Sequence, residues 1–240
     1  MYYETGLIAI DLNACPVLSC GMTISEYLCG NSYPGRIIIA GTTPSGRLLY
    51  AYAIMGRSPN SRNRVFEVSD GEVRTKAHDE SLVKDPSLII YPAVLMCGPS
   101  VIVTNGDQTL DIREALFQGK TMQDALAGRT FEPDGPNWTP RISLVISSDG
   151  FEFAINRRRE DGECERSFWN YPAKKGVFRI IHTYDRDGNP LPSFSGAPRE
   201  IEAEDAFADA LWNALDRDNR ISLYVNEGGK ETVFNAREGD

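Results

Sequence analysis

The chain has 240 residues and a formal net charge of −9, with 41% hydrophobic and 25% charged residues. This composition is typical of a globular protein, and the length suffices for one large core or two smaller ones. The negative charge argues against broad, sequence-independent nucleic-acid binding, which requires a basic face, but it leaves room for a small anionic ligand.

Residues 1–33 read as an irregular N-terminal segment with a short helix around Thr23–Cys29. The first residues carry no basic segment, and the apolar run Leu7–Ile10 is too short for a secretory signal. The longest apolar stretch, around Leu88–Cys97, is about half of a membrane span and contains Pro92. We therefore expect a cytoplasmic protein with no membrane partner.

Strands dominate the next part of the chain, and turn sequences separate them. The expected strands before residue 105 are Arg36–Ala40, Arg47–Met55, Val65–Val68, Glu72–Lys76, Leu88–Cys97 and Val101–Thr104. Two helices follow, Asp111–Gln118 and Met122–Ala127, each ending at a glycine. Thr121 and Asp124 form a weak capping-box match for the second helix.

Strands resume after these helices and lead to the clearest helix of the chain. The expected strands are Arg141–Ser147, Phe151–Arg157, Cys164–Tyr171, Val177–Tyr184, Ile221–Val225 and Glu231–Phe234. The helix is Glu202–Leu215, in which Phe207, Leu211 and Leu215 form one apolar stripe behind acidic residues. Many antiparallel strands with helices in separate blocks predict an α+β fold, with helices layered on sheets. No linker divides the chain, so we expect one domain over residues 1–240.

The cysteines and histidines limit the possible chemistry. The five cysteines, an odd number, include no CxxC pair, so we expect free thiols rather than disulfides or structural zinc. Only two histidines, His78 and His182, are present, which excludes a histidine-rich metal site. Neither histidine has a local motif that would support a Ser-His-Asp triad.

The most informative segment is residues 55–66, MGRSPNSRNRVF, which carries three arginines within eight residues. A cation cluster on an acidic protein is typical of a site for phosphate or carboxylate, which arginine binds in bidentate fashion. The alternative is a hairpin whose arginines pair with surface carboxylates.

Three further polar segments lie where strands begin or end: residues 31–36 (NSYPGR), 104–109 (TNGDQT) and 132–141 (EPDGPNWTPR). Such loops commonly build sites on a rigid scaffold. The segment around Asn105 is either a helix cap, with Asp107 or Thr109 capping, or an anion site at a helix N-terminus. Glu132 and Asp134 are either solvated loop acids or groups held by three neighbouring prolines. Tyr91 lies in an apolar strand, where tyrosine is more often core than catalytic.

Walker A, GxGxxG and GxSxG motifs are absent from the chain, as is basic-aromatic interleaving for RNA. The five segments YPGR (33–36), SPNSRNR (58–64), IIYP (89–92), TNGDQT (104–109) and EPDGPNWTPRI (132–142) nevertheless occur in one characteristic order. In that order they resemble the archaeal-type IMP cyclohydrolase family, and especially its longer bacterial branch. The resemblance covers roughly residues 31–225.

The resemblance implies a four-layered α-β-β-α sandwich similar to the N-terminal-nucleophile hydrolases but without their nucleophile. It implies that the chain closes the ring of 5-formamidoimidazole-4-carboxamide ribonucleotide to give inosine monophosphate and water. The reaction is intramolecular, so neither a metal nor a redox cofactor is required, and we find no site for a folate or for ATP. Its partner is a small purine ribonucleotide.

The resemblance also suggests site residues. Arg64 matches the arginine that closes the SPNSRNR stretch, with Arg62 as the alternative register. Tyr91 and Glu132 match the active-site tyrosine and acid. The substrate-binding candidates are Arg36, Asn60, Arg62, Asn105, Asn137 and Arg141. On chemical grounds, Glu132 would move the proton, Arg64 or Tyr91 would stabilise the oxyanion, and Arg36 with Arg62 would hold the phosphate.

The chain departs from the archaeal enzymes in a longer arginine stretch and in the extension 1–33. Covering the site and forming a contact in a homo-oligomer are two roles open to this extension. Two other functions remain open. One is an amide hydrolase on the same scaffold, with a cysteine nucleophile. The other is a non-catalytic protein that binds a purine nucleotide.

Overall fold

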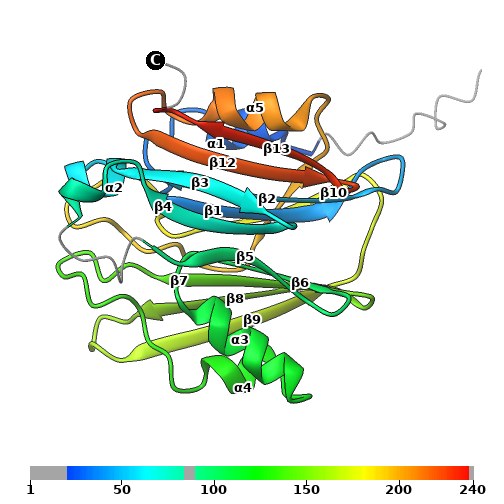
Figure 1. The fold of residues 1–240 in the computed structure, drawn as a ribbon, viewed down its shortest axis with the longest axis horizontal. Helices are drawn as coiled ribbons and strands as arrows, with labels where there is room; N and C mark the ends of the chain where they lie inside the picture. The colour runs from blue at the N-terminus through cyan, green and yellow to red at the C-terminus, as the bar shows by residue number, and fades with distance from the viewer. Residues whose placement is uncertain (1–20, 84–89, 238–240) are drawn as a thin grey trace, which may run out of the picture.

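The computed structural model describes residues 21–83 and 90–237, and these form two antiparallel sheets with helices outside them (Figure 1). The first sheet has six strands in the order β11-β10-β1-β2-β12-β13. Their bounds are β1 Arg36–Thr42, β2 Leu48–Met55, β10 Val177–His182, β11 Arg199–Glu202, β12 Arg220–Glu227 and β13 Lys230–Asn235.

The second sheet has seven strands in sequential order from β3 to β9. Their bounds are β3 Arg64–Ser69, β4 Glu72–Ala77, β5 Pro92–Cys97, β6 Ser100–Thr104, β7 Arg141–Ser147, β8 Gly150–Arg158 and β9 Cys164–Tyr171. At its β3 edge this sheet meets the first one, where the Asn235 side chain bonds both the N–H and the C=O of Phe66. The predicted α+β class is confirmed.

The two sheets pack face to face because their central strands are apolar on both faces. In β1, Ile38 and Ala40 enter the core between the sheets, while Ile37 and Ile39 enter a second core on the outer face. Alternate residues of a strand point to opposite faces, so such a run needs a covering layer on each side. The outer layer of this sheet is supplied by helices.

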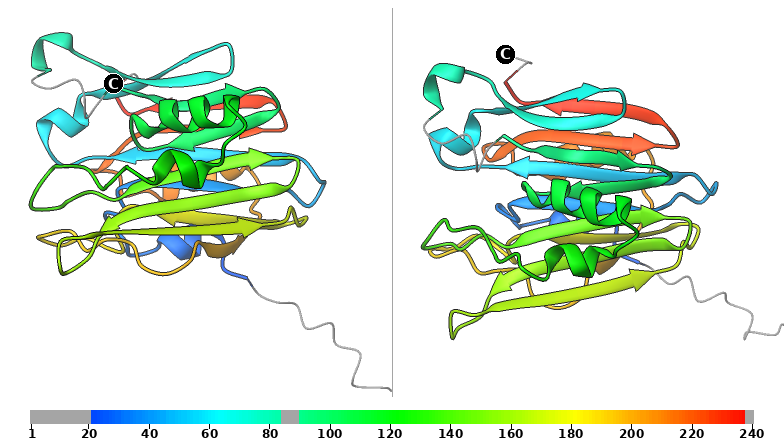
Figure 2. Two further views of the ribbon diagram at one scale, coloured as in Figure 1. Left: turned by 90° about the horizontal axis from the view of Figure 1, so that it is seen from below. Right: turned by 60° about the horizontal axis from the view of Figure 1, so that its bottom comes forward.

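Helices α1 (Ile24–Leu28) and α5 (Phe207–Ala214) cover the first sheet, and α3 (Gln108–Phe117) and α4 (Met122–Leu126) cover the second (Figure 2). The short α2 (Pro59–Arg62) and the 3-10 turn Glu80–Leu82 lie in connections. Capping boxes begin α1 at Thr23 and α4 at Thr121, and the second of these confirms the sequence prediction. Within the described residues, no helix is both long enough and apolar enough to cross a membrane.

Several element boundaries differ from the sequence prediction. Helix α3 begins three residues early, at Gln108, and Asp107 precedes it without a side-chain cap because its carboxylate binds Arg129 and Arg141. The predicted helix Glu202–Leu215 is wrong at its start, since Glu202 ends strand β11 and the helix begins at Phe207. Strand β5 begins at Pro92, and part of the predicted strand from Leu88 lies outside the described residues.

Candidate active site

A cavity of about 340 Å³ lies at one end of the two sheets, a size within the range of small-ligand pockets. Both sheets contribute to its wall. It is lined by Tyr33, Arg36, Arg57, Ser58, Asn60, Ser61, Arg64, Glu132, Asp134, Asn137, Thr139, Tyr184 and Leu191.

A buried ion pair stands at the centre of this lining. Nη2 of Arg36, the first residue of β1, donates to both carboxylate oxygens of Glu132 at 3.2 and 3.4 Å. The side chains are only 12% and 4% exposed. Burial raises the pKa of the Glu132 carboxyl above its ordinary value, and the Arg36 guanidinium opposes this rise without cancelling it. A carboxyl with a raised pKa beside a fixed cation is suited to proton transfer.

Close packing next to Arg36 and hydrogen bonds around Glu132 hold the backbone on each side of this ion pair. Gly35 precedes Arg36 with φ +81°, and a Cβ there would come within 2.2 Å of Thr183 Oγ1, so the close approach requires glycine. The Glu132 N–H donates to Thr139 O at 2.8 Å. Asp134 accepts from the Thr139 N–H at 2.7 Å and from its hydroxyl, which tightens the loop between α4 and β7.

Arg64 supplies a second buried guanidinium, only 2% exposed at the start of β3. Its Nε donates to Ser61 O at 2.9 Å, and among the described residues it has no ion-pair partner within 4.0 Å. Burial lowers its pKa, and the neighbouring Arg36 lowers it further, while Tyr91 acts in the opposite direction. A buried cation without a carboxylate favours an anionic ligand beside it.

Two polar atoms of the lining are also buried without a partner among the described residues: Arg36 Nε and Asn60 Oδ1. Buried polar atoms are nearly always hydrogen-bonded, so unpaired polar atoms in a cavity wall indicate groups that hydrogen-bond a ligand. Asn137 also lines the cavity, and its Oδ1 accepts from the Leu191 N–H at 3.2 Å.

Tyr91 lies outside the cavity lining. It is 3% exposed and belongs to the core between the sheets, where its hydroxyl bonds that of Tyr52 at 2.7 Å. It still influences the charges of the site, because it contributes to the pKa shifts of Arg36 and Arg64. A catalytic role for Tyr91 therefore stays a prediction.

The structure does not bring three other predicted residues into the cavity. Arg62 lies on α2 but lines a different groove, so placing it beside Arg36 at a common phosphate conflicts with this geometry. Asn105 is fully buried and holds the turn before α3 through Pro140 O, the Ile142 N–H and Gln108. Arg141 donates from Nη1 to Asp107 and Gln108, each at 2.8 Å.

Sequence reasoning missed other parts of the wall. Arg57 pairs with Asp187 and lies over the Tyr33 ring at 4.5 Å from its centroid. Arg57 and Tyr33 belong to segments that the sequence analysis singled out, but the sequence could not show that these two side chains line the cavity. Tyr184 and Leu191 come from the chain after β10, where no motif marks them.

The buried histidine lies outside the cavity. His182 is buried outside the cavity between the Tyr27 hydroxyl and Tyr184 O, each 2.7 Å away. Its pKa is lowered to about 4, chiefly by burial. Among the described residues, no group of three or more His, Cys, Asp or Glu side chains is placed to hold a metal ion.

The chain matches the family described as IMP cyclohydrolase-like protein over residues 33–231. It is 32% identical over 186 residues to the IMP cyclohydrolase of Methanopyrus kandleri, covering 68% of this chain and 89% of the relative. Matches to the IMP cyclohydrolases of Methanococcus aeolicus (29% identical) and Methanosphaera stadtmanae (32%) each cover 49% of this chain and 59% of the relative. The chain therefore belongs to the IMP cyclohydrolase-like family, as its motif order predicted.

Proposed function

We propose that the chain is an IMP cyclohydrolase, a hydrolase of purine biosynthesis that forms inosine monophosphate from 5-formamidoimidazole-4-carboxamide ribonucleotide. Two findings support this activity: the family match over residues 33–231 and a relative of that name aligned over 89% of its length. The structural observation that carries it is the buried acid Glu132, open to a cavity that three arginines line: Arg36, Arg57 and Arg64.

Ring closure requires two proton movements. The carboxamide nitrogen attacks the formyl carbon, a C–N bond forms, and one proton passes from that nitrogen to the formyl oxygen. The formamide nitrogen then loses its proton, the C–O bond breaks, and the hydroxyl leaves as water. Because both partners belong to one molecule, the enzyme must mainly hold them in a near-attack geometry and move the protons.

Glu132 is placed to carry these protons. Its raised pKa makes the carboxyl a stronger base once ionised, and Arg36 keeps its two oxygens in a fixed orientation. Arg64 stabilises the oxyanion that develops on the formyl oxygen, since its guanidinium reaches the cavity without a carboxylate partner. Tyr91 acts on this cluster electrostatically, since it contributes to the pKa shifts of Arg36 and Arg64, and its hydroxyl is held by that of Tyr52.

The rest of the lining supplies substrate contacts. Arg57 with the hydroxyls of Ser58 and Ser61 holds the phosphate, in place of Arg62. The amides of Asn60 and Asn137 face the base or ribose. Arginine and short hydroxyl side chains are common phosphate ligands.

The layered arrangement is also proposed to be that of the N-terminal-nucleophile hydrolases without the nucleophile. Two antiparallel sheets packed face to face, each covered by a helix pair, support this assignment. The reaction proposed here needs no covalent nucleophile.

The test is to mix the purified protein with the formylated ribonucleotide and EDTA and to follow ultraviolet absorbance as the ring closes. We expect rapid closure that Arg64→Ala strongly reduces. Tight binding without turnover would instead indicate a nucleotide-binding protein. Of the five cysteines, the three that the structure describes, Cys29, Cys97 and Cys164, do not line the cavity, while Cys15 and Cys20 lie outside the described residues. Thiol alkylation that abolished activity, with protection by substrate, would support the alternative of a cysteine nucleophile.

A further inference from the structure

A second and larger hollow lies beyond α2, on the side away from the active-site cavity. Its volume is about 940 Å³, and it runs from α2 across the chain after β4 to the end of α5, the start of β12 and the end of β13. We name it the arginine groove after four lining residues: Arg62, Arg217, Arg220 and Arg237. Arg62 faces this groove, while Asn60 and Ser61 of the same helix face the active-site cavity.

Positive charge predominates in the described lining of the arginine groove. This lining includes one carboxylate, Asp218, against four guanidinium groups, on a chain whose net charge is −9, and the nearby Asp79 has a pKa that Arg237 helps to lower. Among the described residues, none of the four arginines has an ion pair within 4.0 Å, although eleven ion pairs occur elsewhere. Arg157, Arg159 and Arg179 each find a carboxylate on the same protein, so acidic partners are not scarce. Like charges gathered without partners repel one another, and an anion bound between them removes this cost.

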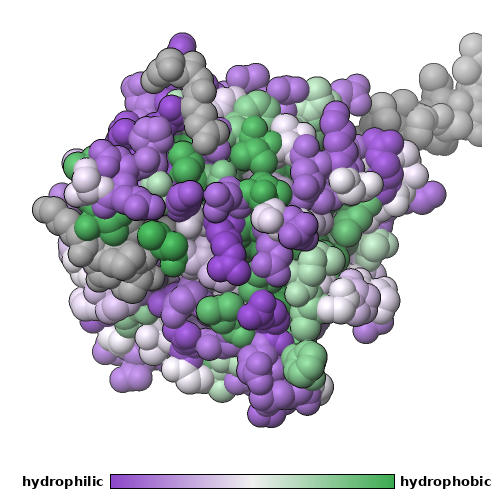
Figure 3. All heavy atoms as spheres, in the orientation of Figure 1, coloured by the Kyte–Doolittle hydropathy of each residue, from purple (hydrophilic) through white to green (hydrophobic). Residues whose placement is uncertain are grey.

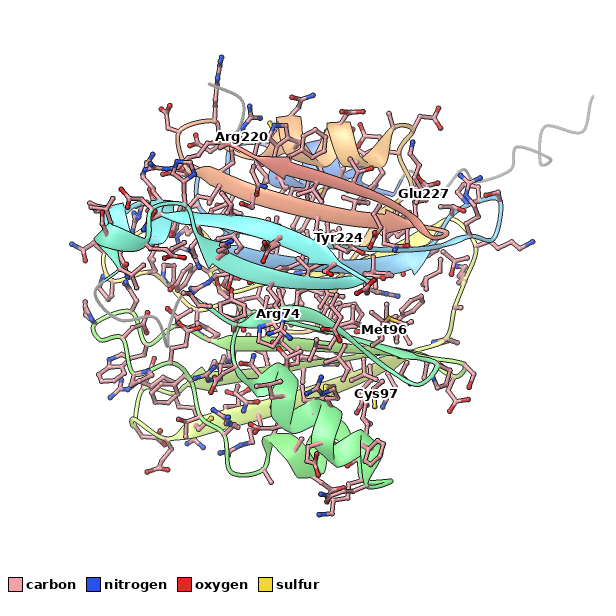
Figure 4. All side chains as sticks on the ribbon, viewed as in Figure 1. Arg74, Met96, Cys97, Arg220, Tyr224 and Glu227 are labelled. Atoms are coloured by element: carbon pink, nitrogen blue, oxygen red, sulfur yellow. The ribbon has the colours of Figure 1, made fainter. Side chains whose placement is uncertain are left out.

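One of these arginines is held in place before any ligand arrives. Arg220 donates from Nη1 to Trp212 O at 2.7 Å, and its guanidinium lies 4.3 Å from the centroid of the Trp212 ring. Trp212 in turn stacks on Phe234, with ring centroids 5.3 Å apart. Figure 4 shows Arg220 and Glu227 at opposite ends of β12, so the positive groove lies at one end of this strand and an acidic residue at the other. A cation fixed by packing loses less entropy when it binds an anion.

The described lining of the arginine groove combines its guanidinium groups with apolar side chains, among them Trp212, Val233 and Phe234. The face seen in Figure 3 is mainly hydrophilic, with hydrophobic atoms in separate patches. Trp212 already contacts Phe234 and Arg220, so guanidinium groups rather than a free aromatic face are the main binding elements. A volume of about 940 Å³ is large for a single phosphate and accommodates a chain of several.

We propose that the arginine groove is a second ligand site, which binds a small anion with several phosphate groups, such as a polyphosphate or the polyphosphate part of a nucleotide. The site is separate from the one proposed for ring closure, and that reaction consumes no such anion. The shared α2 gives a direct connection from this site to Asn60 and Ser61 in the active-site cavity.

The proposal is tested by titrating the full chain with inorganic triphosphate in a calorimeter at low salt. We expect saturable binding that the double variant Arg217→Ala, Arg237→Ala weakens by about tenfold or more, since charge-assisted hydrogen bonds are lost. Both residues are exposed, so the variant should fold normally. The matched control is Arg113→Ala, an exposed arginine on α3 in a different layer, which should leave the affinity unchanged.

Hydrogen exchange locates the bound anion without reference to activity. Protection of residues 212–221 and 233–237 by triphosphate is expected. Three results would each overturn the proposal: no saturable binding at millimolar triphosphate, equal affinity in the double variant and Arg113→Ala, or binding lost in Arg64→Ala but kept in the double variant. The last result would place the anion in the active-site cavity. Failure of the ring-closure assay alone would leave this site unaffected.

Discussion

Replacing Glu132 by glutamine tests the centre of the proposed mechanism. Glutamine keeps the shape of the side chain and an oxygen that accepts from Arg36, but it has no titrating proton. If Glu132 transfers the protons of ring closure, kcat should fall by about 10²–10⁴. That loss corresponds to roughly 3–5 kcal/mol of transition-state stabilisation. The assay is the absorbance change of ring closure at saturating substrate.

The same substitution affects stability, and the two effects have to be separated. At the 3.2 Å separation of Arg36 Nη2 and Glu132 Oε2, the gross attraction is roughly 5 kcal/mol at an effective dielectric constant of about 20. Much of this only offsets desolvation, and leaving one charge of a buried pair alone costs about 3–5 kcal/mol. We expect Glu132→Gln to lower the free energy of unfolding by an amount near the lower end of this range, because the glutamine oxygen still accepts a hydrogen bond from Arg36.

Two variants complete the design. The double variant Arg36→Gln, Glu132→Gln carries neither charge, so it should regain part of the lost stability without regaining kcat. Glu165→Gln removes the carboxylate of a half-exposed pair with Arg157 outside the cavity, and it should leave kcat unchanged. A Glu132→Gln enzyme that turns over within about threefold of the wild type, while folded, would remove Glu132 from the mechanism.

Three further outcomes follow from the structure. Because burial raises the pKa of Glu132, the acid limb of kcat/KM should have its midpoint above the ordinary value of 4.5, and a midpoint at or below 4.5 would contradict the assigned environment. Tyr91→Phe should lower the free energy of unfolding by about 1–2 kcal/mol through the lost bond to Tyr52 and lower kcat less than tenfold; a loss of 10²–10³ would make its hydroxyl an oxyanion donor. Folding lowers the pKa of His182 from 6.5 to about 4, so as the pH falls this histidine is protonated in the unfolded chain before it is protonated in the folded one. The free energy of unfolding should therefore fall by about 3 kcal/mol between pH 6.5 and pH 4. Urea unfolding of the wild type and His182→Asn should show a stability difference that shrinks over that pH range, and a constant difference would refute the assignment.

Most strands could be predicted because their runs of apolar residues indicate that they are buried. Runs such as Ile37–Ile39 are apolar at every position, which fits a strand covered on both faces. Strand β11, with the sequence REIE, was missed because a short polar edge strand has no such signal. Helix α2 was not predicted, since four residues are too few to show a helical pattern.

The candidate site was predictable only in part. Arg36 and Glu132 were singled out by their motifs, and the structure brings them together from positions 96 residues apart. The choice between Arg62 and Arg64 could not be made from spacing. Arg62 ends a helical turn and faces the arginine groove, while Arg64 begins β3 and faces the active-site cavity. Tyr184 and Leu191 enter the wall through loop packing, which no local pattern encodes.

The contribution of both sheets to the cavity wall also has a consequence for folding. The wall takes Arg36 from β1, Arg64 from β3 and Glu132 from the loop before β7. Such contacts join distant parts of the chain, and contacts of this kind form slowly. After dilution from denaturant, hairpins and helices can form before these segments meet. The rate at which enzymatic turnover returns would therefore measure how fast one sheet docks on the other.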